Sequence, residues 1–215
     1  MSDEHTHDHS HAFDRRRLFQ VGGLAAAAAG LAACINGKGS TGDTTTTTST
    51  TLASKTDMTS MRTASSIEAL LVQAYQKILD ANLVTTPAVL EQVKLFQLQH
   101  KAHLTFFEAA TKRGSGPVFS DPNPALVQQI SQQLAGLGSE HDALQLLYNL
   151  EKQATATYQS NVGNLSDPTL NQAVMSVGGA EARHVAALAP TVGQQPVPGA
   201  FASTDGAVAP GTGGL

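Results

Sequence analysis

The chain has 215 residues, of which 41% are hydrophobic, and carries a formal net charge of −4. Basic residues form no run longer than Arg15 to Arg17, so the positively charged surface typical of a nucleic-acid-binding protein is missing. Low-complexity sequence at both ends leaves roughly 128 residues, from 64 to 191, which is enough for one hydrophobic core. A single cysteine excludes a disulfide within the chain.

Residues 1–33 are predicted to be an export signal. A positive cluster precedes an Ala/Gly-rich apolar run of about 13 residues, too short to cross a hydrocarbon core of roughly 30 Å as a helix. Arg16-Arg17-Leu18-Phe19 resembles the twin-arginine export motif, and Leu31-Ala32-Ala33-Cys34 resembles a bacterial lipobox. These resemblances imply lipidation of Cys34 and attachment to the outer face of the bacterial cytoplasmic membrane or to a periplasmic membrane face.

Residues 34–63 are predicted to be a flexible tether. They are rich in threonine and serine and include five consecutive threonines. Such a composition cannot bury enough apolar surface to offset the entropy lost on ordering. The Gly/Pro/Ala-rich residues 192–215 are likewise predicted to be a tail outside the folded domain.

A first amphipathic helix is predicted from Ser65 to about Val84, with a glutamate and a tyrosine in its apolar face. The residues that recur at helical spacing are Glu68, Leu71, Val72, Tyr75 and Leu79. Ser65 and Glu68 also have the spacing of a capping box, so Glu68 has two interpretations: a ligand on a buried face, or the acid of the first helical turn.

A second helix is predicted from Pro87 to Gly114, because Thr86-Pro87 is a typical start and no other glycine or proline intervenes. Two histidines lie three residues apart on its apolar stripe, which contains Val89, Val93, Phe96, His100, His103 and Phe107. Imidazoles on a buried face must be hydrogen-bonded or bound to a metal. Gln97 has the same spacing to His100 and is a second candidate for the first position of the pair.

A short helix is predicted from Ala125 to about Leu137, followed by a third long helix from Ser139 to about Val162. The stripe of this third helix again contains a glutamate followed seven residues later by a tyrosine, Glu151 and Tyr158. Glu151 lies in the middle of its helix, so a capping role does not explain its place on the apolar face.

The last helix is predicted to begin at Ser166-Asp167-Pro168 and to end before Pro190. Its apolar face includes Glu181 and His184, which are three residues apart and therefore share one side of the helix. Gly178 and Gly179 lower helix propensity by about 1 kcal/mol each, and we expect them to allow a close approach of another helix beside Glu181.

The four helices form two similar pairs: a glutamate helix followed by His-x-x-His, then a glutamate helix followed by Glu-x-x-His. This pattern resembles the ferritin-like superfamily, whose four-helix bundles hold two iron or manganese ions with one glutamate from each of two helices and Glu-x-x-His from the others. The resemblance implies an all-α, antiparallel four-helix bundle over residues 64–191, with an extra short helix between the second and third long helices.

The resemblance also implies roles for individual residues. Glu68 and Glu151 match the single-glutamate positions, His103 and His184 the histidine positions, and Glu181 a bridging glutamate. Tyr75 matches a tyrosine that ferritins often place seven residues after the first glutamate, and Tyr158 repeats that spacing in the third long helix. Both tyrosines are therefore expected to donate hydrogen bonds to the ligands.

His100 departs from the family pattern, because it occupies the place of the second bridging glutamate. The candidate ligands are then three carboxylates and three histidines: Glu68, His100, His103, Glu151, Glu181 and His184. The family favours iron, while the larger share of imidazole also suits zinc, copper or Fe(II), with manganese a further candidate.

We therefore expect a membrane-attached monomer or dimer that binds one or two transition-metal ions, with a metal-centred redox reaction as its activity. The alternative is a metal-free structural or protein-interaction module, in which glutamates and histidines form buried hydrogen-bonded pairs. The identity of a protein partner is not specified by the sequence.

Overall fold

The computed structural model describes residues 54–215, in which all regular secondary structure is helical and no β-strand occurs. The predicted export signal with Arg16 and Arg17, the predicted lipidation site Cys34 and the tether up to residue 53 lie outside the described residues. Among the helices of the described part, none is both long and apolar enough to cross a membrane.

The first described helix, α2, spans Lys55–Asp80 and begins about ten residues earlier than predicted. Its capping box is formed by Ser54 and Asp57, so the prediction that Ser65 caps the helix is wrong. The expected tether is correspondingly shorter, because residues 55–63 form the first turns of α2. Met58 and Met61 extend the buried stripe in this direction, and Glu68 lies in the middle of the helix.

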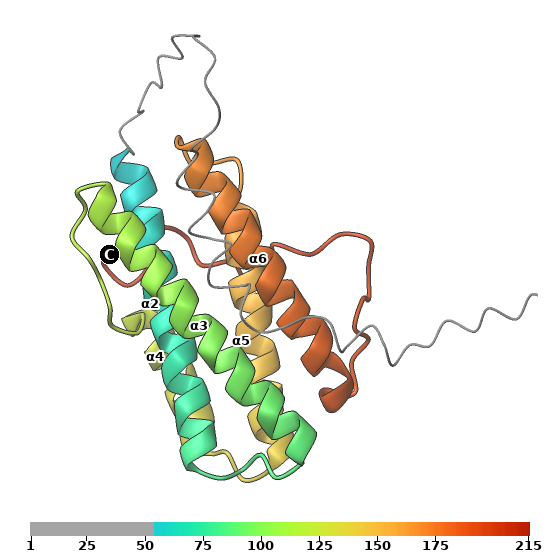
Figure 1. Cartoon of the computed structure of the whole chain (residues 1–215). Helices are drawn as coiled ribbons and strands as arrows, with labels where there is room; N and C mark the ends of the chain where they lie inside the picture. The colour runs from blue at the N-terminus through green and yellow to red at the C-terminus, as the bar shows by residue number, and fades with distance from the viewer. Residues whose placement is uncertain (1–53) are drawn as a thin grey trace, which may run out of the picture. The chain divides into compact units, whose positions relative to one another are not determined.

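Helix α3 spans Pro87–Arg113, with Thr86 as its N-cap and Gly114 as its C-cap. It packs along α2, to which a short connection joins it (Figure 1). Helix α4 is short and spans Pro124–Ala135. The N-cap of α4, Asn123, is buried and donates hydrogen bonds to Ser66 of α2 and to the backbone of Thr212, so it joins three parts of the chain.

Helices α5 (Glu140–Asn161) and α6 (Pro168–Leu188) form the second packed pair, and a 3₁₀ helix, η1 (Ala189–Val192), follows α6. Ser139 caps α5 and Asp167 caps α6 through side-chain hydrogen bonds to backbone N–H groups, as the sequence predicts. Asp57 of α2 accepts two hydrogen bonds from Ser166, which tie the start of α2 to the loop between α5 and α6.

The four long helices lie side by side around one apolar core, and α4 lies to the side of them (Figure 1). The two helix pairs meet through contacts of α2 with α5 and of α3 with α6. Large buried side chains come from all four helices and include Leu71, Phe107, Leu147 and Leu188. The polar residues described below interrupt this core at mid-height.

The C-terminal residues pack against the helices, in contrast to the predicted loose tail. Val208 is buried in the core, and its backbone N–H donates to Thr157 Oγ1 of α5 at 2.9 Å. Gly211 donates in the same way to Thr63 Oγ1 of α2 at 2.9 Å. Two helix threonines therefore accept hydrogen bonds that composition alone gives no reason to expect.

Candidate metal centre

Each long helix contributes to a buried cluster of polar side chains in the middle of the core. Helix α2 provides Glu68, α3 His100 and His103, α5 Glu151, and α6 Glu181 and His184. Five of these side chains are at most 2% exposed, and that of His103 is 11% exposed. The six predicted ligands thus lie together, because each apolar stripe turns its polar members toward the same centre.

His100 lies between the two glutamates of α2 and α5. Its Nδ1 is 2.9 Å from Glu68 Oε2, and its Nε2 is 2.8 Å from Glu151 Oε1. Its ring is fully buried and lies near the Tyr75 ring, with the two centroids 5.1 Å apart. Both ring nitrogens therefore face carboxylates on different helices.

Glu181 and His184 close the cluster from α6. His184 Nδ1 is 3.0 Å from Glu181 Oε2 and 3.2 Å from Glu151 Oε2. The other nitrogen of His184 donates to Gln99 Oε1 at 2.5 Å, and the ring stacks on Phe96 with centroids 4.0 Å apart. These contacts fix the ring so that Nδ1 points at the carboxylates.

The cluster divides into two groups of four possible ligands, each with all its ligand atoms within 4.8 Å of one another. One group contains Glu68 and His103, and the other contains Glu151 and His184; His100 and Glu181 belong to both. Each group offers two imidazole nitrogens and two carboxylate oxygens, a donor set that suits divalent transition metals.

Two atoms of the cluster lack a hydrogen bond although they are buried. His103 Nδ1 and Glu181 Oε1 lie 2.8 Å apart, yet neither makes a hydrogen bond of acceptable geometry. A buried polar atom without a partner costs about 1–3 kcal/mol. A cation between these two atoms and Glu68 Oε2, which is 3.7 Å from His103 Nδ1, would compensate both.

The pKa values of the cluster reflect burial and mutual attraction. Burial alone would raise the pKa of Glu68, but the hydrogen bond with His100 and the charges of His100 and His103 lower it to about 2. Burial alone would lower the pKa of His103, but Glu181 and Glu68 raise it to about 9. Without a metal, protonated histidines therefore balance the carboxylates.

Glu181 differs from the other two glutamates. Burial raises its pKa, and the nearby carboxylates of Glu68 and Glu151 raise it further against the opposing charge of His100. In contrast, burial alone would raise the pKa of Glu151, but the charge of His100 outweighs it. The pKa of Glu151 therefore lies well below its ordinary value. Glu181 is thus the carboxylate with the least compensated charge, and its Oε1 is the one without a hydrogen bond.

The two tyrosines anchor the glutamates of α2 and α5. The hydroxyl of Tyr158 donates to Glu68 Oε1, and that of Tyr75 donates to Glu151 Oε1. Both tyrosines are completely or almost completely buried. Each carboxylate is therefore oriented by a tyrosine on the other glutamate helix, which leaves Glu68 Oε2 and Glu151 Oε2 directed at histidines.

Two glutamines of α3 make contacts that were not predicted from the sequence. Gln97, the alternative to His100, donates to the backbone of Val72 and to Gln76, outside the cluster. Gln99, which the sequence does not single out, holds Nε2 of His184. Its only sequence signal is its place beside His100, and that place does not show which histidine on another helix it reaches.

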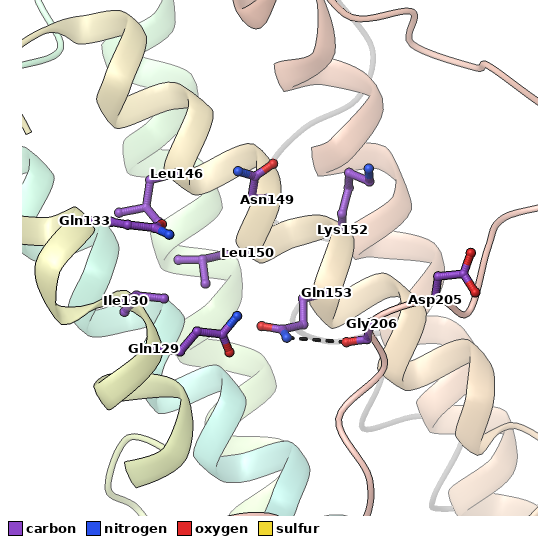
Figure 2. Close-up of a pocket in the computed structure, with 10 residues that line it drawn as sticks. All are labelled: Gln129, Ile130, Gln133, Leu146, Asn149, Leu150, Lys152, Gln153, Asp205 and Gly206. Carbon is purple, nitrogen blue, oxygen red and sulfur yellow. Dashed lines mark hydrogen bonds between the residues drawn. The ribbon is translucent and has the colours of Figure 1, made fainter.

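A surface pocket of about 270 Å³ lies elsewhere, between α4, α5 and the C-terminal residues (Figure 2). Its walls include Gln129, Asn149 and Gln153, and Gln153 donates to the backbone of Gly206 at 3.3 Å. None of the six predicted ligands lines it. The pocket is therefore distinct from the buried polar cluster.

Comparison with known proteins identifies the family. A model of the ferritin-like domain matches residues 56–194, more than half of the chain, and the chain therefore belongs to the ferritin-like domain family. The match begins within the first turn of α2, in agreement with the early start of that helix. Comparisons with curated proteins and with solved structures gave no match.

Proposed function

We propose that this protein is an exported, lipid-anchored ferritin-like protein that binds one or two transition-metal ions in its helical core. The ligands are Glu68, His100, His103, Glu151, Glu181 and His184. The observation that carries the proposal is the pair of atoms His103 Nδ1 and Glu181 Oε1, which lie 2.8 Å apart without a hydrogen bond of good geometry, buried among carboxylates and imidazoles from four helices.

The arrangement of the helices supports this assignment. In the proposed topology, α2, α3, α5 and α6 form the antiparallel four-helix bundle of the ferritin-like fold, and α4 is the extra short helix. The ligands then occupy family positions, with His100 in place of a bridging glutamate. Iron is the metal that the family favours, while zinc, manganese and copper also fit two imidazoles and two carboxylates.

A bound metal would supply an electron donor or acceptor for a redox reaction. The chain's own residues hold the carboxylates and imidazoles in place: Tyr75 and Tyr158 orient Glu151 and Glu68, and Gln99 orients His184. The apolar side chains around the cluster exclude water, because the ligand side chains other than His103 are at most 2% exposed.

The competing function is a metal-free structural or protein-interaction module with a vestigial site. The observation in its favour is that both ring nitrogens of His100 have carboxylate partners. A protonated His100 therefore has its hydrogen bonds without a metal. His103 Nδ1 and Glu181 Oε1 can form an ion pair at 2.8 Å when His103 is protonated, but they do not make a hydrogen bond of good geometry. We therefore favour the metal-binding function.

Metal analysis of the full chain, purified after export in its own host, tests the proposal. We expect at least one transition-metal ion per chain, and its loss in a Glu151→Ala, Glu181→Ala double variant. His141→Ala is the matched control, because His141 is an exposed histidine of α5 outside the cluster. A metal-free protein whose stability does not respond to a chelator would contradict the proposal.

The membrane attachment rests on the motifs around Arg16, Arg17 and Cys34. We expect Cys34→Ala to release the protein from membrane fractions or to block processing of the precursor, and Arg16→Lys, Arg17→Lys to prevent export by the twin-arginine route. Unchanged membrane association of the Cys34→Ala variant would exclude a lipid anchor. We expect the exported protein to be a monomer or dimer that binds no nucleic acid.

A further inference from the structure

The two groups of ligands share a histidine where the family pattern has a glutamate. We propose that His100 bridges two divalent metal ions, with Nδ1 bound to the ion held by Glu68 and His103, and Nε2 bound to the ion held by Glu151 and His184. The inference rests on the proposed metal-binding function and specifies two ions with an imidazolate between them.

The position of the His100 ring supports a bridge. Nδ1 is 2.9 Å from Glu68 Oε2 and 3.7 Å from Glu181 Oε1, while Nε2 is 2.8 Å from Glu151 Oε1. The two nitrogens therefore face different ligand groups. A histidine that bound only one ion would leave its second nitrogen among the ligands of the other group.

The surroundings hold the ring in this orientation. His100 is completely buried, with the Tyr75 and His184 rings at centroid distances of 5.1 Å and 5.2 Å and the His103 ring at 6.0 Å. Rings on several sides restrict rotation of the imidazole. The ring therefore cannot turn both nitrogens toward one group without displacing its neighbours.

Glu181 is placed to form the second bridge. Its Oε1 is 2.8 Å from His103 Nδ1 in one group, and its Oε2 is 3.0 Å from His184 Nδ1 in the other. His100 and Glu181 thus lie between the same two groups, each with one ligand atom directed at either side. This is the arrangement of two bridging ligands, one nitrogenous and one anionic.

The charges of the centre explain why a histidine can stand in for a bridging glutamate. Two divalent ions contribute four positive charges, and the three carboxylates of the cluster contribute three negative charges. To hold a second divalent ion through Nε2, neutral His100 would lose its remaining N–H proton to solvent and bind the ion as an imidazolate. The imidazolate then supplies the fourth negative charge, so the buried centre is neutral and its desolvation cost is smallest.

Copper(II) loading of the full chain provides a direct test. We expect two Cu(II) ions per chain by elemental analysis after dialysis, together with loss of most of the copper signal in electron paramagnetic resonance at liquid-helium temperature, because an imidazolate couples the two spins. Loading with equal amounts of Cu(II) and Zn(II) should restore part of the signal, because in chains that hold one ion of each metal the copper spin has no coupled partner. This comparison uses only the wild-type chain.

A variant series locates the bridge. In His100→Gln we expect one Cu(II) per chain with a full, uncoupled signal, because an amide does not bridge as an anion; His141→Gln should behave like the wild type. His100→Glu should again hold two ions. Circular dichroism confirms that each variant is folded. If His100→Gln does not fold, Glu181→Gln decides the question, because coupling should persist there through His100 and its loss would assign the coupling to Glu181.

The outcomes separate this inference from the proposed function. One ion per chain, or two ions with two full spins, would overturn the histidine bridge and leave metal binding intact. Persistent coupling in His100→Gln would also overturn the bridge. Failure to bind copper, zinc, iron or manganese at all would overturn both the bridge and the proposed function.

Discussion

Tyr75 of α2 donates its hydroxyl hydrogen to Glu151 of α5, seventy-six residues further along the chain. The reciprocal bond runs from Tyr158 of α5 to Glu68 of α2. Each tyrosine lies seven residues after a glutamate on its own helix but binds the glutamate of the other. This exchange links the two helix pairs through the polar cluster, so the orientation of the ligands depends on how the pairs pack.

Removal of either hydroxyl should destabilise the protein. A hydrogen bond to a charged group contributes about 1.5–3 kcal/mol, so we expect Tyr75→Phe and Tyr158→Phe each to lower the free energy of unfolding by about 2 kcal/mol. Urea unfolding of metal-free protein measures this as a lower midpoint at unchanged slope. Tyr148→Phe is the control, because Tyr148 lies outside the cluster and its loss should cost less than about 0.5 kcal/mol.

Gly178 and Gly179 should respond in opposite directions to alanine. A Cβ on Gly178 would lie 3.0 Å from Tyr158 Cβ, whereas a Cβ on Gly179 would meet nothing within 4 Å. We expect Gly179→Ala to stabilise α6 by about 0.5–1 kcal/mol through helix propensity. Gly178→Ala should destabilise the protein by about 1–3 kcal/mol, because it forces α6 away from α5 and disturbs Tyr158.

Thermal unfolding of the two glycine variants, both metal-free, measures the change in stability that each alanine causes. Each variant serves as the control for the other. Equal stabilisation by both alanines would show that α5 and α6 are not closely packed at Gly178. The sequence predicted a close helix approach at both glycines, but in the structure only Gly178 lies close to another helix. Gly179 is exposed, and its place in the helix has no packing explanation.

The sequence indicated the residues of the polar cluster because helical periodicity reports which residues share a face. Glu151, Glu181 and His184 were found in this way, and the structure brings them together. Periodicity does not report which residue on another helix a side chain meets. The crossed tyrosine pairs and the contact of Gln99 with His184 are of this second kind.

Two other differences have local causes. The start of α2 was misplaced because Ser54 with Asp57 and Ser65 with Glu68 both have the spacing of a capping box, and composition favoured the later one. The packing of the C-terminal residues was missed because it depends on one buried valine and on backbone donors. Neither produces a periodic pattern.

Truncation of that valine should measure how much the C-terminal residues contribute. Val208 is 5% exposed and Val197 is 77% exposed, which makes them a matched pair. We expect Val208→Ala to lower the free energy of unfolding by about 1–2 kcal/mol, because two buried methyl groups are lost. Val197→Ala should change it by less than about 0.5 kcal/mol, and equal effects would contradict packing of this segment.

The pH dependence of metal-free protein should report the charge balance of the cluster. The folded pKa of His103, about 9, lies above its ordinary value of 6.5, so its contribution is fully present below pH 6.5 and is lost as the pH rises toward 9. The folded pKa of Glu68, about 2, lies below its ordinary value of 4.5, so its contribution is present above pH 4.5 and is lost as the pH falls toward 2. Stability should therefore be greatest between these two ordinary values.

Urea unfolding in the presence of a chelator, at about pH 5.5 and about pH 9.5, measures the alkaline side of this profile. We expect a loss of about 3 kcal/mol from His103 alone, since each unit of pKa shift corresponds to about 1.4 kcal/mol. His103→Gln should reduce the difference in the free energy of unfolding between the two pH values, whereas His141→Gln should leave it unchanged.

A metal-loaded protein should show the opposite trend in stability above pH 6.5, because protons then compete less with the metal for the same nitrogens. If chelated protein were as stable at the higher pH as at the lower one, protonated histidines would not be what balances the buried carboxylates.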